Sequence, residues 1–270
     1  MRPSFLALPR PAVACIQAAS RVDEALATIR NGEFDGADAF AIHLRFPRPE
    51  MLTRENLAGI AASTKKPVMF LLYRGDAQWP CAPTDEDRAE VMALAIEAGG
   101  AAVDITGDMF DESPLEITRK SEAVEKQMRF IERIHRLGGE IVLSSHIAQA
   151  RSLEQVVEHL LTFEKRGADY VKIVTKADTE AEFVEAVETT LALRHALKTP
   201  FIHLCGGEFA RPHRFLAPTL GCALTFCVER YTPSFTTAQP PLRAMKSVLG
   251  NVQWHIDQTI PLDRDTGKEG

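Results

Sequence analysis

Short apolar runs alternate with longer amphipathic segments along almost the whole chain, and this alternation restricts the possible folds more than any other feature. Eight runs have the length and composition of buried strands: Val13–Gln17, Ala39–Leu44, Pro67–Tyr73, Ala101–Ile105, Glu140–Ser144, Tyr170–Val174, Phe201–Leu204 and Ala223–Cys227. The segments that follow them favour helices: Arg21–Arg30, Thr53–Ala62, Thr84–Glu97, Pro114–Leu137, Ser152–Arg166, Thr179–Leu197, Ala210–Leu220 and Pro240–Val252. Eight strands and eight helices in strict alternation predict an α/β protein, a single-domain (β/α)8 TIM barrel.

Local signals agree with this interpretation. Thr84 stands before Asp85 and Glu86, and Ser152 stands before Leu153, Glu154 and Gln155, as at helix N-termini. The main alternative is an open, doubly wound sheet, but no GxGxxG sequence follows an early strand, so a dinucleotide-binding half has no support. No long linker divides the chain. We therefore expect one domain over residues 1–270, with a loose polar tail at 261–270.

The composition narrows the class of function. Of the 270 residues, 45% are hydrophobic and 25% are charged, and the net charge is −6, so we expect no surface for nucleic acid or an anionic membrane. No apolar run approaches the roughly 20 residues of a membrane-spanning helix. The five cysteines form no CxxC pair, and we interpret them as reduced, buried thiols of a cytoplasmic protein.

The carboxyl ends of the predicted strands carry the reactive side chains, which is where a (β/α)8 barrel places its chemistry. These residues are His43, Arg45, Arg74, Gln78, Asp104, His146, Lys172, His203, Cys205, Arg211, Arg214 and Gln239. Together they predict a polar pocket with a net positive charge. Such a pocket suits a small, anionic, oxygen-rich substrate.

Two of these residues form the most informative pair. Lys172 lies inside an apolar strand, where an ammonium group is costly unless it is neutral or paired. His146 follows the preceding strand, so both side chains converge if the two strands belong to one parallel barrel. An imidazole beside a buried amine is suited to imine chemistry, in which the lysine condenses with a ketone and the histidine moves a proton.

Several motifs go beyond this pair. They are SSHIAQARS with His146, GADYVKIVT with Lys172, LTF at 224–226 before a Ser/Thr-rich loop that ends in Gln239, HLR at 43–45 and YR at 73–74. With these motifs the chain resembles the type I 3-dehydroquinate dehydratase family, (β/α)8 Schiff-base lyases of the shikimate pathway. The resemblance covers most of the chain, from the second predicted strand to the last helix.

The resemblance implies specific roles. Lys172 would form an imine with the ring ketone of 3-dehydroquinate or a close cyclic keto acid. His146 would remove the adjacent carbon-bound proton and later protonate the departing hydroxyl, which gives 3-dehydroshikimate or an analogous enone. The implied substrate contacts are His43, Arg45, Arg74, Gln78, His203, Arg214, Thr236 (or its neighbours Ser234 and Thr237) and Gln239. Arg214 would pair with the substrate carboxylate, and neither a metal nor an organic cofactor is needed.

The sequence also departs from the family pattern. The family has a Glu where this chain has His43, a second Glu at the position of Gln78, and a D-x-E pattern where Thr106 follows Asp104 by two residues. The reacting pair matches, while the groups that would read the substrate's hydroxyls differ. This pattern favours a lyase for a related but different ketone, or an enzyme altered in rate or pH range, with a more positive pocket.

Alternatives stay open for individual residues. Arg211 could replace Arg214, Arg45 and Arg74 could be ion pairs at the barrel end, and His203 could be a packing residue. His146 could be structural, Lys172 could extend to solvent, and Asp104 could orient either of them. A metal held by histidines of three strands with Asp104 has no spacing signature.

For the whole chain, a Schiff-base aldolase-type lyase acting on another oxo compound is a second hypothesis. A non-catalytic, ligand-binding barrel derived from the family is a third. A homodimer is compatible with the resemblance, although the sequence carries no interface signature.

Overall fold

The structure, a computed structural model, describes residues 2–74, 84–232 and 237–252. Its strands are β1 (Ala12–Ala19), β2 (Ala39–Leu44), β3 (Val68–Leu71), β4 (Ala102–Thr106), β5 (Glu140–His146), β6 (Tyr170–Lys176), β7 (Phe201–Gly206) and β8 (Leu224–Cys227). They form one sheet in the order β7-β6-β5-β4-β3-β2-β1-β8, and neighbouring strands in this order are paired in parallel. At the seam, the Ala223 N–H donates to the Phe201 carbonyl at 2.9 Å. The sheet is thus a nearly closed barrel, which confirms the predicted (β/α)8 fold.

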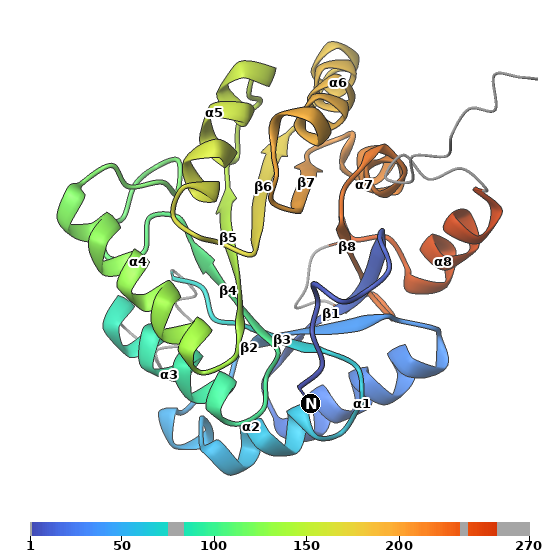
Figure 1. The fold of residues 1–270 in the computed structure, drawn as a ribbon. Helices are drawn as coiled ribbons and strands as arrows, with labels where there is room; N and C mark the ends of the chain where they lie inside the picture. Colours follow the sequence, from blue (N-terminus) through green and yellow to red (C-terminus); the bar gives the residue numbers. More distant parts are fainter. Residues whose placement is uncertain (1, 75–83, 233–236, 253–270) are drawn as a thin grey trace, which may run out of the picture.

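The helices surround the strands (Figure 1). They are α1 (Val22–Phe34), α2 (Arg54–Ala61), α3 (Asp85–Glu97), α4 (Ser121–Arg136), α5 (Leu153–Glu164), α6 (Glu180–Ala196), α7 (Ala210–Leu216) and α8 (Leu242–Asn251), with 3-10 turns η1 (Pro49–Met51) and η2 (Ala217–Leu220). Thr84 and Ser152 cap α3 and α5 as predicted, each in a reciprocal capping box. The predicted helix over Ala210–Leu220 is α-helical only to Leu216, since Pro218 cannot donate a backbone hydrogen bond.

The largest difference from a predicted boundary lies before α4. The helix expected over Pro114–Leu137 begins only at Ser121, and the residues before it form a loop. In that loop the Ser113 hydroxyl donates to the Ile117 carbonyl and accepts from the Ile117 N–H, both at 3.0 Å. A parallel bridge joins Ile117 to Gly107, and Glu116 has a φ of 47°. These local bonds replace the helical ones and tie the loop to the end of β4.

Alternate strand residues face two separate cores. The interior of the barrel holds Ala12, Ala14, Ile16, Ala39, Ala41, Met69, Leu71, Val142, Tyr170, Ile202, Leu204, Leu224 and Phe226. The layer between strands and helices holds residues of the opposite phase, among them Val13, Phe40, Ile42, Val103, Ile141, Val171 and Ile173. Because side chains alternate along a strand, Lys172 shares the interior face with Tyr170, whereas His203 has the phase of the outer layer.

The amino ends of the strands are closed by the N-terminal segment. Phe5 is fully buried in the interior core, and its carbonyl accepts a hydrogen bond from the Tyr170 hydroxyl at 2.9 Å. The Glu140 carboxylate accepts from the Phe5 N–H at 3.0 Å. Access to Lys172 therefore comes from the carboxyl ends of the strands.

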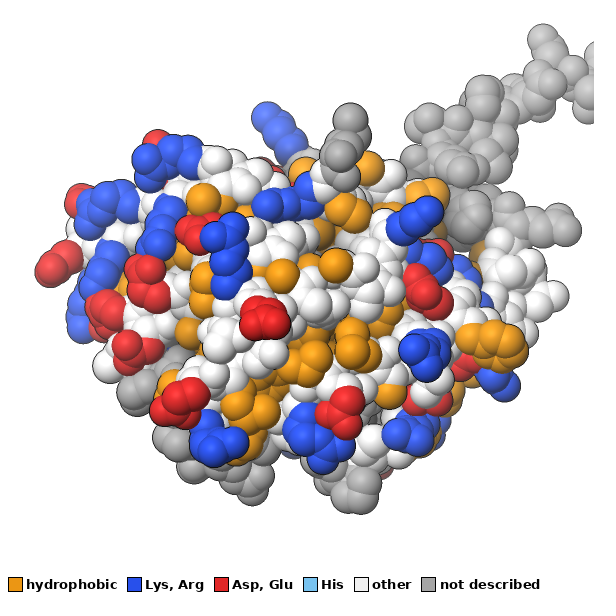
Figure 2. Space-filling view, turned by 90° about the horizontal axis from the view of Figure 1, so that it is seen from below, with side chains coloured by type: hydrophobic (Ala, Val, Ile, Leu, Met, Phe, Trp, Pro, Cys, Tyr) orange, Lys and Arg blue, Asp and Glu red, His pale blue; other side chains and the backbone are white. Residues whose placement is uncertain are grey.

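On the described part of the face drawn in Figure 2, basic and acidic side chains are interspersed between apolar ones. Within the described residues, no helix is long and apolar enough to cross a bilayer.

A buried arginine anchors the loop that follows β4. Arg166 donates to the Gly107 carbonyl and to the Gln127 side chain, both at 2.7 Å, and to the Thr118 carbonyl at 2.5 Å. Burial lowers the pKa of its guanidinium to about 10, which still leaves it charged at neutral pH. Arg166 thereby joins α4, the β4–α4 loop and the α5–β6 connection.

We predict that Arg166→Met destabilises the protein by roughly 3 kcal/mol, because buried carbonyl groups lose a charged donor that methionine cannot replace. The measurement is the free energy of unfolding from urea titration. Arg129→Met on α4 is the matched control, since Arg129 is exposed and forms a surface pair with Glu125, and it should change stability by no more than about 0.5 kcal/mol. Equal effects of the two substitutions would contradict the anchoring role.

Neutral histidines are packed between the barrel and its helices. The Thr190 hydroxyl of α6 lies 2.8 Å from Nδ1 of His203 and 3.1 Å from Nε2 of His213, and it donates to the Ala186 carbonyl. Burial lowers the pKa of His213 from 6.5 to about 4 and that of His203 well below 6.5. Both rings are therefore uncharged at neutral pH.

These shifts predict a pH-dependent stability. The folded-state pKa of His213 lies below its unfolded value, so between pH 6.5 and 4 the unfolded chain binds more protons. Stability contributed by neutral His213 is complete above pH 6.5 and is lost as the pH falls, by at most about 1.4 kcal/mol per pH unit.

The measurement is the urea midpoint between pH 7 and 4 for His213→Gln, with the exposed His195→Gln as control. We expect a flatter pH dependence for His213→Gln alone. A slope equal to that of the wild type would refute the assignment.

Candidate active site

A buried ion pair lies inside the barrel. The Lys172 ammonium on β6 is 2.8 Å from the Asp104 carboxylate on β4, and both residues are almost fully buried. The Ser144 hydroxyl donates to the other Asp104 oxygen at 2.5 Å, and the Tyr73 hydroxyl lies 3.0 Å from the Lys172 nitrogen. The Phe226 ring lies 5.2 Å from the same nitrogen. The sequence left Lys172 either neutral or paired and Asp104 beside either Lys172 or His146, and in the structure Lys172 is paired with Asp104.

His146 lies one step nearer the mouth of the barrel than Lys172. Lys172 is aligned with Ser144 of β5, and His146 is two residues further along the same strand. The Tyr73 ring stands edge-on to the His146 ring, with 4.9 Å between their centres. Burial raises the pKa of Tyr73 well above 10, so the phenol is protonated. Tyr73 thus contacts both members of the predicted reacting pair.

His43 completes this cluster from β2. Its ring centre is 5.3 Å from that of Tyr73. Burial, followed by the positive charge of Arg45, lowers the pKa of His43 to about 3, so this ring is neutral at physiological pH. The structure therefore brings together His43, His146 and Lys172, three of the residues expected at the site.

A second part of the predicted site is built around Arg214. Its Nε donates to the Cys205 carbonyl at the end of β7 at 2.9 Å, and its Nη1 donates to the Gln239 side chain at 2.7 Å. Both residues are buried. Arg211 is instead exposed and donates to the Tyr231 hydroxyl at 2.7 Å. The position of Arg214 at the carboxyl end of β7 favours it over Arg211 as the anion-binding arginine.

Glu116 is a site residue that the sequence analysis missed. Its carboxylate oxygen lies 3.0 Å from Nδ1 of His146 and accepts the His146 backbone N–H at 2.7 Å. The residue belongs to the β4–α4 loop, which the helical pattern had assigned to a helix. Loop geometry of this kind leaves no periodic signal in the sequence. Glu116 also adds a negative charge to a pocket that the sequence predicted to be more positive.

The other two predicted arginines have different surroundings. Arg74 pairs with Asp85 at 2.6 Å and with Asp108 at 2.9 Å, which is the ion-pair alternative for this residue. Its guanidinium is therefore directed to carboxylates of the protein. Arg45 follows β2 and lines a cavity of about 390 Å³ between α1 and the segment after β8, together with Gln17.

His203 is not brought to the site. Its ring lies in the outer layer against α6 and α7, with its centre 4.9 Å from that of His213. The substrate contact expected for His203 is corrected to a packing role, because the strand phase turns its side chain away from Lys172. The alternative metal site on three strands has no support for the same reason. The group of His and Cys found close together within the described residues is His203, Cys205 and His213, in that outer layer.

Two of the expected substrate contacts, Gln78 and Thr236, lie outside the described residues, as do the neighbouring Ser234 and the tail at 261–270.

The buried ion pair generates a stability prediction. Asp104→Asn and Lys172→Met should each destabilise the protein by about 3–5 kcal/mol, because each leaves one charge buried without its partner. The double variant should cost much less than the sum of the two. The measurement is a double-mutant cycle of unfolding free energies.

The exposed pair of Arg133 and Glu90 is the matched control. Arg133→Met with Glu90→Gln should show a coupling of no more than about 1 kcal/mol. Additive effects at Asp104 and Lys172 would show that the two groups do not stabilise each other.

Comparison with known proteins identifies the family to which the chain is related. The sequence profile described as Type I 3-dehydroquinase matches residues 14–254. A 3-dehydroquinate dehydratase from Desulfotalea psychrophila is 27% identical over 149 residues, which cover 54% of this chain and 59% of that protein. Another, from Alkaliphilus oremlandii, is 25% identical over 128 residues, which cover 47% of this chain and 48% of that protein. The chain thus spans about half the length of the curated relatives it matches.

Solved structures agree in fold. The 3-dehydroquinate dehydratase from Geobacillus kaustophilus has a TM-score of 0.75 at 15% identity, covering 93% of this chain and 95% of that one. The type I enzyme from Clostridium difficile has a TM-score of 0.73 at 16% identity, covering 90% and 92%. Because the family profile spans most of the sequence and the barrel agrees with it, this chain belongs to the Type I 3-dehydroquinase family.

Proposed function

We propose that the protein is a cofactor-free carbon–oxygen lyase that dehydrates 3-dehydroquinate, or a closely related cyclic keto acid, through a Schiff base on Lys172. One observation carries the proposal: a buried lysine and a histidine on adjacent strands, with Tyr73 in contact with both. The family membership of the chain supports the same chemistry. Within this proposal the enzyme is cytoplasmic and works in the shikimate pathway.

The first stage forms the imine. The Lys172 ammonium gives up one proton and the amine attacks the ketone carbon. The same proton is returned to the carbinolamine oxygen, which leaves as water and gives a cationic imine. Asp104 lies 2.8 Å from the nitrogen, so its negative charge stabilises the cation before and after the carbon–nitrogen bond forms. The protonated Tyr73 hydroxyl, 3.0 Å from the same nitrogen, can donate a hydrogen bond to the oxygen that departs as water.

The second stage is the elimination. His146 takes the proton from the carbon next to the imine, and the electron pair moves into the imine to form an enamine. The enamine expels the hydroxyl one carbon further away, and the proton on His146 is returned to it, so water leaves. Hydrolysis of the new imine releases the enone and frees Lys172. Each proton taken is given back, so the cycle needs no external acid or oxidant.

Substrate recognition is assigned to the Arg214–Gln239 pair. A guanidinium group is suited to a carboxylate, and burial, which lowers the pKa of Arg214 to about 10, strengthens its interaction with an anion. Because Gln239 already accepts from Arg214, the two can act as one unit toward the substrate. A neutral, buried His43 where the family has an acidic residue supports a related ketone with a different hydroxyl pattern as the second candidate substrate.

The test is trapping with borohydride in the presence of 3-dehydroquinate, followed by mass spectrometry of the intact protein and its peptides. We expect a reduced adduct on Lys172 and none in Lys172→Ala. Lys176→Ala, at the exposed end of the same strand, is the matched control and should trap normally. His146→Ala should still trap while kcat falls on the order of 10²–10⁴-fold, the effect of losing an acid/base group.

Other outcomes separate the alternatives. An adduct only with a different ketone would favour the second substrate or an aldolase-type lyase. No adduct with any keto acid, from folded protein, would contradict the proposal and leave a ligand-binding barrel. Full activity in His146→Ala would refute the role of that residue.

A further inference from the structure

We infer that Glu116 is the positioning residue of the general base: its carboxylate holds Nδ1 of His146, so that Nε2 is the nitrogen that takes the substrate's proton. The inference rests on the proposed function and deepens it. The carboxylate comes from the β4–α4 loop, whereas the family places an acidic residue at the position of Gln78.

Two interactions join Glu116 to His146. One oxygen of Glu116 lies 3.0 Å from Nδ1 of the imidazole and 2.7 Å from the His146 backbone nitrogen. A carboxylate can only accept, so Nδ1 carries a proton in this bond, and the neutral ring then has its free electron pair on Nε2. The carboxylate therefore fixes the tautomer, and its bond to the main chain fixes the ring relative to β5.

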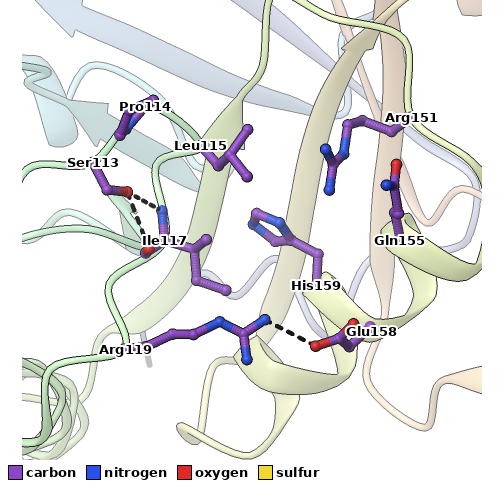
Figure 3. A pocket seen from close by; sticks show the side chains of 9 residues that line it. All are labelled: Ser113, Pro114, Leu115, Ile117, Arg119, Arg151, Gln155, Glu158 and His159. Atoms are coloured by element: carbon purple, nitrogen blue, oxygen red, sulfur yellow. Dashed lines mark hydrogen bonds and ion pairs between the residues drawn. The ribbon is translucent and has the colours of Figure 1, made fainter.

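The loop around Glu116 is internally braced. The side chain of Ser113 bonds to both the carbonyl and the N–H of Ile117, so Glu116 is held inside a closed turn. Figure 3 shows these two bonds, with Leu115 and Ile117 facing α5 across a cavity of about 210 Å³. Glu116 itself has a φ of 47°, in the left-handed region that residues other than glycine seldom adopt. Such a conformation persists only where surrounding bonds impose it.

A second chain of bonds links the loop to α5. The Ser145 hydroxyl donates to the Glu116 carbonyl at 2.7 Å and lies 2.8 Å from Nε2 of His159. Because that hydroxyl proton is used, the His159 Nε2–H must be the donor of the second bond. Burial lowers the pKa of His159 to about 4, so this ring is neutral and the arrangement is stable at physiological pH. Ser145, which precedes the base His146, thus holds the backbone of Glu116, which orients that base.

The charged groups around His146 also support this role of Glu116. The charged or titratable side chains around His146 are Glu116 from the β4–α4 loop, Tyr73 after β3, His43 on β2, Asp104 on β4 and Lys172 on β6. Tyr73 and His43 are neutral, and Asp104 is paired with Lys172. Glu116 is therefore the group that directly compensates the positive charge when His146 accepts a proton.

The experiment compares Glu116→Gln and Glu116→Asp with Glu112→Gln, an exposed acidic residue near the same loop. Glutamine keeps the size but can no longer compensate the imidazolium. We expect kcat of Glu116→Gln to fall on the order of 10²-fold with KM little changed, and the acidic limb of the kcat/KM profile to move to lower pH. Aspartate should recover part of the rate, and Glu112→Gln should behave as the wild type.

A substrate-independent readout keeps this inference separate from the proposed function. Nitrogen-15 NMR of His146 should show the Nδ1–H tautomer in the wild type and a mixture of tautomers in Glu116→Gln, whether or not dehydroquinate is the substrate. Unchanged tautomer and pH profile in Glu116→Gln would overturn the inference. A uniform loss of folded protein, with the profile of the active remainder unchanged, would also overturn it, since Glu116 would then be structural only.

Discussion

The pairing of Lys172 with Asp104 inside the barrel is the interaction on which the rest of the site depends. Bringing two charges out of water has a large free-energy cost, which attraction and extra hydrogen bonds must offset. Ser144 on β5 and Tyr73 after β3 supply those bonds, from the two strands that flank β4 in the sheet. Below it the interior is apolar and is closed by Phe5, which leaves the carboxyl ends as the open side.

The groups around the pair are kept neutral by the same burial. Desolvation raises the pKa of Tyr73 and lowers that of His43, so neither adds a competing charge beside Lys172. The low-dielectric surroundings then strengthen the effect of the few charges that remain. Glu116 lies beside His146, and Arg214 lies at the end of β7. In the chemistry we propose, these charges have separate tasks. The imine forms beside Asp104, the base His146 lies beside Glu116, and the substrate anion binds to Arg214.

The sequence was sufficient for features that follow from a strong apolar pattern or from the free-energy cost of burying a charge. All eight strands follow from the apolar runs, and the cost of a buried ammonium group indicated that Lys172 is either neutral or paired, of which the structure shows the pair. The sequence could not show whether His203 faces the interior of the barrel or the surrounding helices. Both faces of a barrel strand are buried, so the apolar pattern does not distinguish them. It also missed Glu116, because the amphipathic pattern of α4 was extended into a loop that local bonds to Ser113 hold instead.

The placement of Glu116 shows how a barrel can change one part of its site while keeping another. Lys172, Asp104 and His146 lie on strands, whose register is fixed by the closed sheet. Glu116 lies on a loop, whose position depends on Arg166 beneath it and on Ser145 beside it. A loop can acquire a new acidic residue without moving any strand, provided that buried donors fix its backbone. The orientation of His146 therefore depends on Arg166, which donates its hydrogen bonds to the loop and not to the reacting groups. A substitution of Arg166 would change the position of the loop and thereby the orientation of His146.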